Sequence, residues 1–281
     1  MVAPAAVLLL ILLGFPTLLT VVYSLHNVPA NGRGLGPFVG FENYRTVFEA
    51  RAFWRSVSVT LWFSVGFVVL STLIGLAMAL LLNQRFIGRG VARALLIVPW
   101  ATPWLVIGIL WKWFLDGSVG GLNSILFQIG LIDDYIEFLA DPDLALPMVV
   151  IAAVWRQASF SGLLFLAGLQ TLPGELKEAA SIDGAGAVQR FRHIVLPWLR
   201  PVVITVLVLN IIYAFLQFDI VFAMTQGGPG DATQVLGFLI YRQMFGAANI
   251  GIGSTLAVLL ALASLMGGLL TVALLYKKEE Y

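Results

Sequence analysis

The sequence predicts an all-α integral membrane protein with six transmembrane helices. Hydrophobic residues make up 60% of its 281 residues and charged residues 11%, whereas soluble domains carry roughly 25% charged residues. Six apolar segments reach the length of about 20 residues with which a helix crosses a bilayer: residues 4–23, 57–82, 94–115, 145–169, 202–224 and 255–276. None alternates between polar and apolar residues as barrel strands do. Helices are therefore expected throughout, because lipid offers the backbone no other hydrogen-bond partner.

The first segment is expected to be a retained helix and not a cleaved signal peptide. No Lys or Arg precedes its apolar run, and no small-x-small cleavage site follows it, although a secretory signal carries both features. Three parts are expected along the chain. Residues 1–55 hold the first helix and an outer loop, residues 56–276 form the transmembrane domain, and residues 277–281 form a short tail.

Basic residues divide unevenly between the two sets of loops. The second and fourth loops and the tail hold Arg85, Arg89, Arg93, Lys177, Arg190, Arg192, Arg200, Lys277 and Lys278. The other set, whose third loop is acidic, holds Arg33, Arg45, Arg51, Arg55, Lys112 and Arg242. Because short loops rich in Lys and Arg stay on the cytoplasmic side, both termini and the fourth loop are expected in the cytoplasm.

The fourth loop, residues 173–201, carries the most informative motif. It is predicted to form two short helices, because Pro173 suits a first helical turn and Gly184 with Gly186 ends the helix that follows it. Glu178-Ala179-Ala180 is separated by three residues from Gly184. Nine residues later comes Ile194-Val195-Leu196-Pro197, where the chain is expected to turn back toward the membrane.

This spacing resembles the EAA loop in the membrane subunits of binding-protein-dependent ABC importers. The resemblance implies a type-1 importer permease fold, with the loop docked in a groove on an ATP-hydrolysing subunit so that closure of the ATPase dimer moves the membrane helices. The residues that it assigns to coupling are Glu178, Ala179, Ala180, Asp183, Gly184 and Ala185. The alternative is an ordinary amphipathic cytoplasmic loop.

Three more elements extend the resemblance over nearly the whole chain. They are Phe41-Glu42-Asn43-Tyr44, the proline pair within residues 98–103, and Phe218-Asp219 followed by residues 225–229. All three are similar to elements of permeases from the carbohydrate-uptake group. That group implies an ATP-binding subunit dimer, a second homologous permease and an extracytoplasmic solute-binding protein as partners, in the cytoplasmic membrane of a prokaryote. The chain contains no Gly-x-x-x-x-Gly-Lys-Ser/Thr loop, which is the phosphate-binding signature. ATP and Mg²⁺ are therefore expected on the partner subunit, with no cofactor in this chain.

Polar and aromatic residues within three of the segments predict a path for a sugar. A sugar presents hydroxyl groups and apolar C–H faces, so aromatic platforms and hydrogen-bonding side chains suit it, and polar side chains in membrane helices tend to face an interior cavity. In maltose-type permeases these same three helices build the cavity in the middle of the membrane. The candidate residues are Trp100, Trp104, Arg156, Gln157, Phe160, Asn210, Tyr213 and Gln217.

Local geometry refines this expectation. Asn210, Tyr213 and Gln217 fall at i, i+3 and i+7, which is one face of a helix. Pro103 is expected to kink the third helix or to open its backbone hydrogen bonding. The glycines of residues 227–230 are expected to form a turn with positive φ.

Each candidate has a structural alternative. The tryptophans suit the aromatic belt at a membrane interface, and Asn210 and Gln217 suit hydrogen-bonded bridges between helices. Arg156 suits an ion pair with Asp219, a water-filled path or contact with an anionic substrate. The last option keeps glycerol phosphate or another polyol phosphate as an alternative cargo.

Two other functional classes fit the sequence less well. An ion-coupled secondary transporter predicts acidic residues deep in several helices and an inverted repeat, but only Asp219 approaches the first condition and no repeat is visible. An intramembrane enzyme needs paired catalytic groups or a metal cluster, whereas the chain has no Cys and only His26 and His193. A non-enzymatic transport subunit without a metal site is expected, which passes a sugar or oligosaccharide with energy supplied by another polypeptide.

Overall fold

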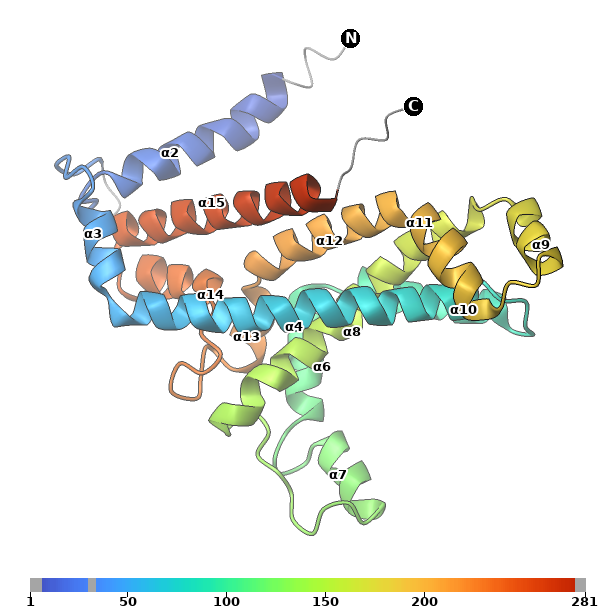
Figure 1. Ribbon diagram of the computed structural model, residues 1–281. Helices are drawn as coiled ribbons and strands as arrows, with labels where there is room; N and C mark the ends of the chain where they lie inside the picture. The colour runs from blue at the N-terminus through green and yellow to red at the C-terminus, as the bar shows by residue number, and fades with distance from the viewer. Residues whose placement is uncertain (1–6, 30–33, 276–281) are drawn as a thin grey trace.

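The computed structural model describes residues 7–29 and 34–275, and helices dominate it (Figure 1). Four of them are long and apolar enough to cross a membrane: Val7–Ser24, Arg51–Leu82, Pro142–Gln170 and Ile250–Leu275. Two further spans arise if each of two sharply bent helix pairs is one crossing. No β-strand is formed within the described ranges. The all-α membrane fold is therefore confirmed, and the six predicted segments correspond to four continuous helices and two broken ones.

Helix α8 (Pro142–Gln170) is the central helix of the bundle. Over an apolar stretch of 18 residues in α8, 67% of the residues are buried. The corresponding share is 6% in Val7–Ser24 and 11% in Ile250–Leu275. Helix α4 (Arg51–Leu82) packs along α8 and crosses in front of it in Figure 1. Gly75 permits this approach, because a Cβ there would lie 2.6 Å from the Cβ of Ser161. The outer helices instead keep apolar side chains exposed, as lipid-facing helices do.

The third predicted segment is broken at Thr102 and Pro103. Helix α5 (Arg89–Ala101) and helix α6 (Trp104–Phe114) meet there at 99°. Proline has no N–H to donate and disfavours helical backbone in the residue before it. Thr102 is accordingly extended, with ψ 133°, and the helix ends there. The expected effect of Pro103 is confirmed, and the break is sharper than an ordinary proline kink.

The prediction of one helix over residues 202–224 is wrong. Helix α12 (Arg200–Phe215) ends before Leu216, and a short helix α13 (Asp219–Met224) starts after Phe218. The start of helix α14 (Leu236–Tyr241) occupies the break, since a Cβ on Gly237 would lie 2.6 Å from the carbonyl oxygen of Gln217. This packing is tertiary, and the polar residues Gln217 and Asp219 beside the break are its only trace in the sequence of this segment.

The first transmembrane segment is fastened to the rest of the chain by Asn43. A π-helical turn η1 (Leu10–Gly14) and α2 (Phe15–Ser24) precede the outer loop, and α3 (Glu42–Glu49) follows it. The Asn43 side-chain amide donates to the carbonyl oxygens of Ser24 at 2.9 Å and His26 at 3.0 Å. Helix α4 then begins at Arg51, so the expected domain boundary between residues 55 and 56 falls inside a helix.

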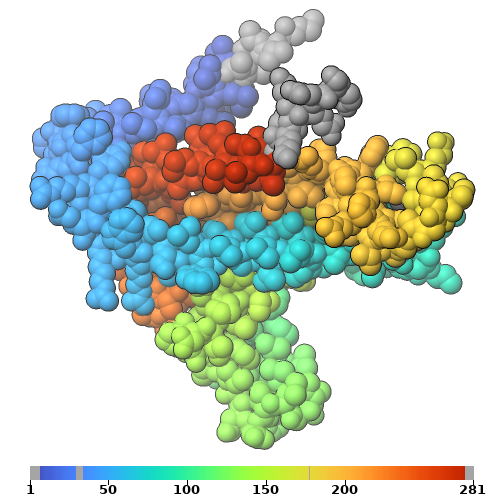
Figure 2. All heavy atoms as spheres, in the orientation of Figure 1, coloured from blue at the N-terminus to red at the C-terminus, as the bar shows by residue number. Residues whose placement is uncertain are grey.

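The acidic third loop is folded around Asn123 of helix α7 (Gly121–Gln128). This buried amide donates to the carbonyl oxygens of Asp116 and Ile136 and accepts the Ile136 N–H at 3.0 Å. The Asp116 carboxylate accepts N–H groups from Val119 and Ser118, which lowers the pKa of Asp116. The loop is thus an ordered projection, visible together with α6 below the bundle in Figures 1 and 2.

The glycine-rich segment after α13 forms a closed turn. Gly227 and Gly230 have positive φ, at +81° and +53°, whereas Gly228 does not. The Thr233 hydroxyl donates to the Gly228 carbonyl at 2.7 Å, and Arg242 pairs with Asp231 at 2.9 Å. Arg242 begins the π-helical turn η3 (Arg242–Gly246), which precedes α15 (Ile250–Leu275). The predicted turn is confirmed, with two of its three glycines in the expected conformation.

Loops expected on one side of the membrane lie at one end of the bundle. In Figure 1 helix α9 (Gly174–Ile182) and the loop after α4 lie at the right end, opposite α3. Which end faces the cytoplasm stays a prediction. Residues 1–6, the tail over 277–281 and Arg33 lie outside the described residues.

Candidate functional site

The six residues assigned to coupling form the C-terminal end of α9 and its cap. Ala185 N–H donates to the Ala180 carbonyl at 2.9 Å, and Gly184 N–H donates to the Ser181 carbonyl at 3.2 Å. Together these bonds form a Schellman motif, which requires a left-handed residue just past the helix. Gly184 supplies it with φ +80°. The glycine in the motif therefore has a local structural reason, independent of any partner.

The outer surface of this cap is open. A Cβ on Gly184 would meet nothing within 4 Å, and Glu178, Ala179 and Asp183 are exposed. Beside them, a hollow of about 390 Å³ is lined by Asp183, Gly184, Ala185, Gln189, Arg190, His193 and Ile194. Small side chains around a hollow give a partner protein room to approach the backbone closely.

Two large apolar side chains flank this surface, and sequence reasoning missed both. Ile182 is 86% exposed and Val188 is 79% exposed. An exposed apolar patch with a polar rim is typical of a protein–protein contact. The signal that could have identified them is their position in one of the few polar stretches of the chain, where no lipid is expected to cover them.

The second helix of this loop continues past Leu196-Pro197. It begins with α10 (Ala187–Arg190), passes through the π-helical turn η2 (Phe191–Val195) and ends with α11 (Leu196–Trp198). The chain therefore does not turn back at Leu196-Pro197, because Pro197 sits in the first turn of α11, where its missing N–H is tolerated. The turn comes at Leu199, where the helix over 187–198 meets α12 at 68°. Pro173 occupies the N-cap position of α9 and so precedes the first turn of that helix.

Arg156 of α8 donates a hydrogen bond to the backbone at the break in the third span. Its Nε donates to the Thr102 carbonyl oxygen at 3.0 Å, and its guanidinium lies 4.2 Å from the ring centroid of Trp104. A backbone carbonyl exposed by a helix break in a membrane needs such a partner. The ion pair with Asp219 is not formed in the described part of the chain, where the ion pairs are Arg45–Glu49 and Arg242–Asp231.

Trp100, Phe160 and Tyr213, from helices α5, α8 and α12, form an aromatic trio. The Trp100 and Phe160 rings stack at 5.8 Å, and Phe160 meets Tyr213 edge to face at 6.3 Å. Trp100 is 40% exposed and Tyr213 is 38% exposed. The structure thus gathers Trp100, Phe160 and Tyr213 into one accessible surface, with Arg156 and Trp104 at the neighbouring helix break.

Asn210 and Gln157 lie apart from that surface, in a buried polar network. The Gln157 Nε2 donates to Asn210 Oδ1 at 2.8 Å, and the Asn210 Nδ2 donates to the hydroxyls of Thr72 at 3.1 Å and Ser161 at 3.2 Å. Both amide side chains are fully buried. The bonds join α4, α8 and α12, which is the geometry of a bridge between helices.

The expected common face of Asn210, Tyr213 and Gln217 is not formed. Helix α12 ends at Phe215, so the helical spacing does not extend to Gln217. Gln217 is buried in the break before α13, while Tyr213 is exposed and Asn210 points into the network. A separation of seven residues places side chains on one face only while the helix continues.

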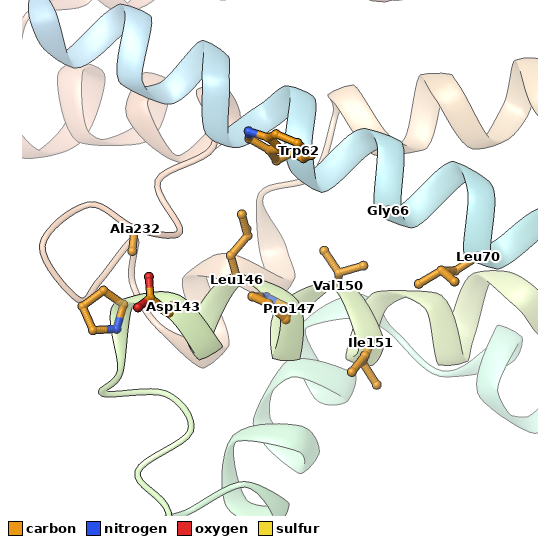
Figure 3. Close-up of a pocket in the computed structure, with 10 residues that line it drawn as sticks. Trp62, Gly66, Leu70, Asp143, Leu146, Pro147, Val150, Ile151 and Ala232 are labelled. Carbon is orange, nitrogen blue, oxygen red and sulfur yellow. The ribbon is translucent and has the colours of Figure 1, made fainter.

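An apolar groove of about 660 Å³ lies elsewhere, between α4 and α8 (Figure 3). Trp62 projects from α4 above Leu146 and Pro147 of α8, and Asp143 lies at one end. No residue of the predicted sugar path lines this groove. Its apolar walls suit lipid or another apolar surface better than a polyhydroxylated solute.

Comparison with known proteins agrees with this architecture. Residues 71–277 match the family model described as binding-protein-dependent transport system inner membrane component. A trehalose/maltose transport system permease protein of Thermococcus litoralis is 40% identical over 263 residues, which are 92% of this chain and 86% of that protein. An sn-glycerol-3-phosphate transport system permease protein of Agrobacterium fabrum is 36% identical over 261 residues, 92% of this chain and 88% of that protein.

A solved structure shares the fold. It is that of a bacterial ABC transporter involved in the import of the acidic polysaccharide alginate. The likeness has a TM-score of 0.83 at 24% identity and covers 98% of this chain and 93% of that chain.

Proposed function

The chain belongs to the family of binding-protein-dependent transport system inner membrane components, and on that premise we propose that it passes a sugar or oligosaccharide across the cytoplasmic membrane of a prokaryote. Two relatives named for trehalose/maltose and for sn-glycerol-3-phosphate transport cover most of the chain. A permease subunit of this family is a transport component, so the chemical energy comes from a different polypeptide.

Coupling runs through the capped end of α9. The observation that carries this proposal is the combination of a rigid Schellman cap at Gly184 with bare surface above it and exposed Ile182 and Val188 beside it. Glu178, Ala179, Ala180, Asp183, Gly184 and Ala185 meet the ATPase subunit there. ATP and Mg²⁺ are bound by that partner dimer, and a second permease and an extracytoplasmic solute-binding protein complete the importer. Both termini and this loop lie in the cytoplasm.

The solute passes beside the aromatic trio. The exposed faces of Trp100 and Tyr213 offer apolar platforms for the C–H faces of a sugar ring, and Phe160 holds them at fixed angles. Arg156 and Trp104 line the same path at the helix break. Gln157 and Asn210 support it from behind by joining the three helices, and Gln217 lies buried just past the end of α12.

A polyol phosphate is the second candidate cargo. Arg156 is half-buried, and its one hydrogen bond to another described residue uses Nε. Its terminal nitrogens are therefore free to meet a phosphate, which arginine binds well. The relative named for sn-glycerol-3-phosphate transport supports keeping this alternative.

The test is transport by the assembled importer in proteoliposomes. The tagged chain is purified with the proteins that accompany it, identified by mass spectrometry, and reconstituted with ATP inside. ATP-dependent uptake of trehalose or maltose that glycerol 3-phosphate does not compete for supports the sugar. The reverse pattern supports the polyol phosphate. Uptake by the chain alone without ATP would overturn both.

A further inference from the structure

A groove lined by two arginines lies where the loop helix meets the membrane span. Its walls are Arg192, Leu196, Pro197, Arg200, Val203, Ile204 and Leu275, and its volume is about 340 Å³. Arg192, Leu196, Arg200 and Ile204 recur every four residues, so one stripe continues from the loop helix across the 68° bend into α12. The end of α15, at Leu275, also lines the groove.

Arg200 is fixed in this groove by the end of α15. Its Nε and Nη2 both donate to the Leu275 carbonyl oxygen, at 3.2 and 2.6 Å. The last carbonyls of a helix lack partners within the helix and carry partial negative charge, so a cation is favourable there. Arg200 keeps further N–H donors, because a guanidinium has five.

Arg192 is the second cation of the groove. It is exposed, and within the described residues it makes no hydrogen bond or ion pair. Beyond the two arginines the walls are entirely apolar: Leu196, Pro197, Val203, Ile204 and Leu275. Two cations beside hydrocarbon walls are complementary to a molecule that carries an anionic group on an apolar chain.

The level of the groove in the membrane fits such a molecule. It lies at the ends of two apolar helices, where α12 begins and α15 finishes. Nearby Trp198 is 41% exposed, and its indole N–H donates to the Thr171 hydroxyl at 3.2 Å. Tryptophan with a polar partner is enriched at the interface between lipid and water. The phosphate level of a bilayer is therefore expected beside the two arginines.

We propose that this groove binds an anionic phospholipid, with its phosphate between Arg192 and Arg200 and an acyl chain along Val203 and Ile204. Basic pockets between membrane helices are known to bind such headgroups, and a basic residue near an anionic membrane surface contributes about fivefold in affinity. The lipid contacts the loop helix and both spans at once, so it ties the coupling segment to the bilayer.

The test is lipid retention by the complete importer. Wild type and the variants Arg192→Gln and Arg85→Gln are equilibrated in vesicles of phosphatidylcholine with phosphatidylglycerol, and retained lipid is counted by native mass spectrometry. Arg85 is an exposed arginine of another loop and serves as the matched control. We expect Arg192→Gln to bind phosphatidylglycerol about fivefold more weakly, with Arg85→Gln unchanged and phosphatidylcholine retained poorly by all three.

Arg192→Gln is chosen because Arg200→Gln also removes the cap of α15 and could prevent assembly. Equal retention of phosphatidylglycerol by wild type and Arg192→Gln would overturn the proposal. Displacement of the lipid by excess inorganic phosphate would also overturn it, because the site would then bind an anion without its chain. An increase in retained lipid on replacing Glu279 and Glu280 by Gln, with no effect of Arg192→Gln, would overturn it as well, because the arginines would then serve these two carboxylates of the chain's own tail.

Discussion

The Gln157 amide donates to Asn210 at 2.8 Å inside the bundle, and both side chains are completely buried. Asn210 also reaches Thr72 of α4, so one side chain joins three helices. Buried polar groups in a membrane domain hold helices together and cannot be removed singly without leaving a partner unsatisfied. This pair therefore ties α4, α8 and α12 to one another through buried hydrogen bonds.

Replacing Asn210 by Ala should destabilise the protein more than it changes solute affinity. The variant leaves the Gln157 amide and the Thr72 hydroxyl without their partner, at a cost of about 1 to 3 kcal/mol. Thermal unfolding of the detergent-solubilised importer measures this, with Thr205→Ala as the control because Thr205 is exposed on the same helix. Unchanged unfolding combined with altered solute affinity would place Asn210 in the solute path after all.

Replacing Tyr213 by Ala should give the opposite result. Tyr213 is partly exposed and touches Phe160 only edge to face, so little packing is lost. If its contact with a sugar equals a contact between aromatic rings, affinity falls roughly two- to tenfold. Uptake titrations measure this, with Trp113→Ala as the control because Trp113 is 70% exposed on α6 and outside the trio. Identical titrations for the Tyr213 variant and the control would remove the trio from the path.

A large side chain at position 184 should abolish ATP-driven uptake. Gly184→Trp places an indole on the open surface above the cap, where the ATPase subunit is proposed to dock. It also strains a residue with φ +80°, by about 1 to 2 kcal/mol. Gly130→Trp is the matched control, since Gly130 has φ +71° and equally open surroundings in the third loop. Equal losses of uptake would attribute the effect to backbone strain and not to docking.

Replacing Ile182 by Ser should weaken retention of the ATPase subunit. The isoleucine is 86% exposed, and burying such a side chain in an interface contributes about 1.5 to 3 kcal/mol. Retention falls by roughly tenfold or more, measured as ATPase recovered with the tagged chain. Leu131→Ser is the control, since Leu131 is 69% exposed in the third loop. Full recovery of ATPase with the Ile182 variant would show that this apolar patch serves another contact.

The elements that follow local rules could be predicted from the sequence. Pro103 breaks its helix and Gly184 ends α9 because each acts through its own backbone, whatever surrounds it. The all-helical architecture likewise follows from apolar length alone. The helix end within the stretch from Glu178 to Gly184 could be predicted for the same reason, because the residues that form the Schellman cap are consecutive in the sequence.

The features that depend on distant residues could not be predicted. The break at Gln217 exists because α14 packs into it, and Gly237 lies 20 residues further along the chain. The partner of Asn210 is 53 residues away, so the sequence left a bridge and a solute contact equally open. The sequence identifies Arg156 as a candidate residue, but its acceptor, the carbonyl of Thr102, is a backbone atom and carries no sequence signal.

The elbow at Leu199 makes the loop helix a lever arm. Twelve residues from Ala187 to Trp198 rise about 18 Å in total, and they meet α12 at 68°. A rotation of about 10° at the elbow therefore displaces the far end, beside Gly184, by roughly 3 Å on that same rise. Conversely, a shift of about 3 Å imposed at the far end is reduced to a small angular change at the span.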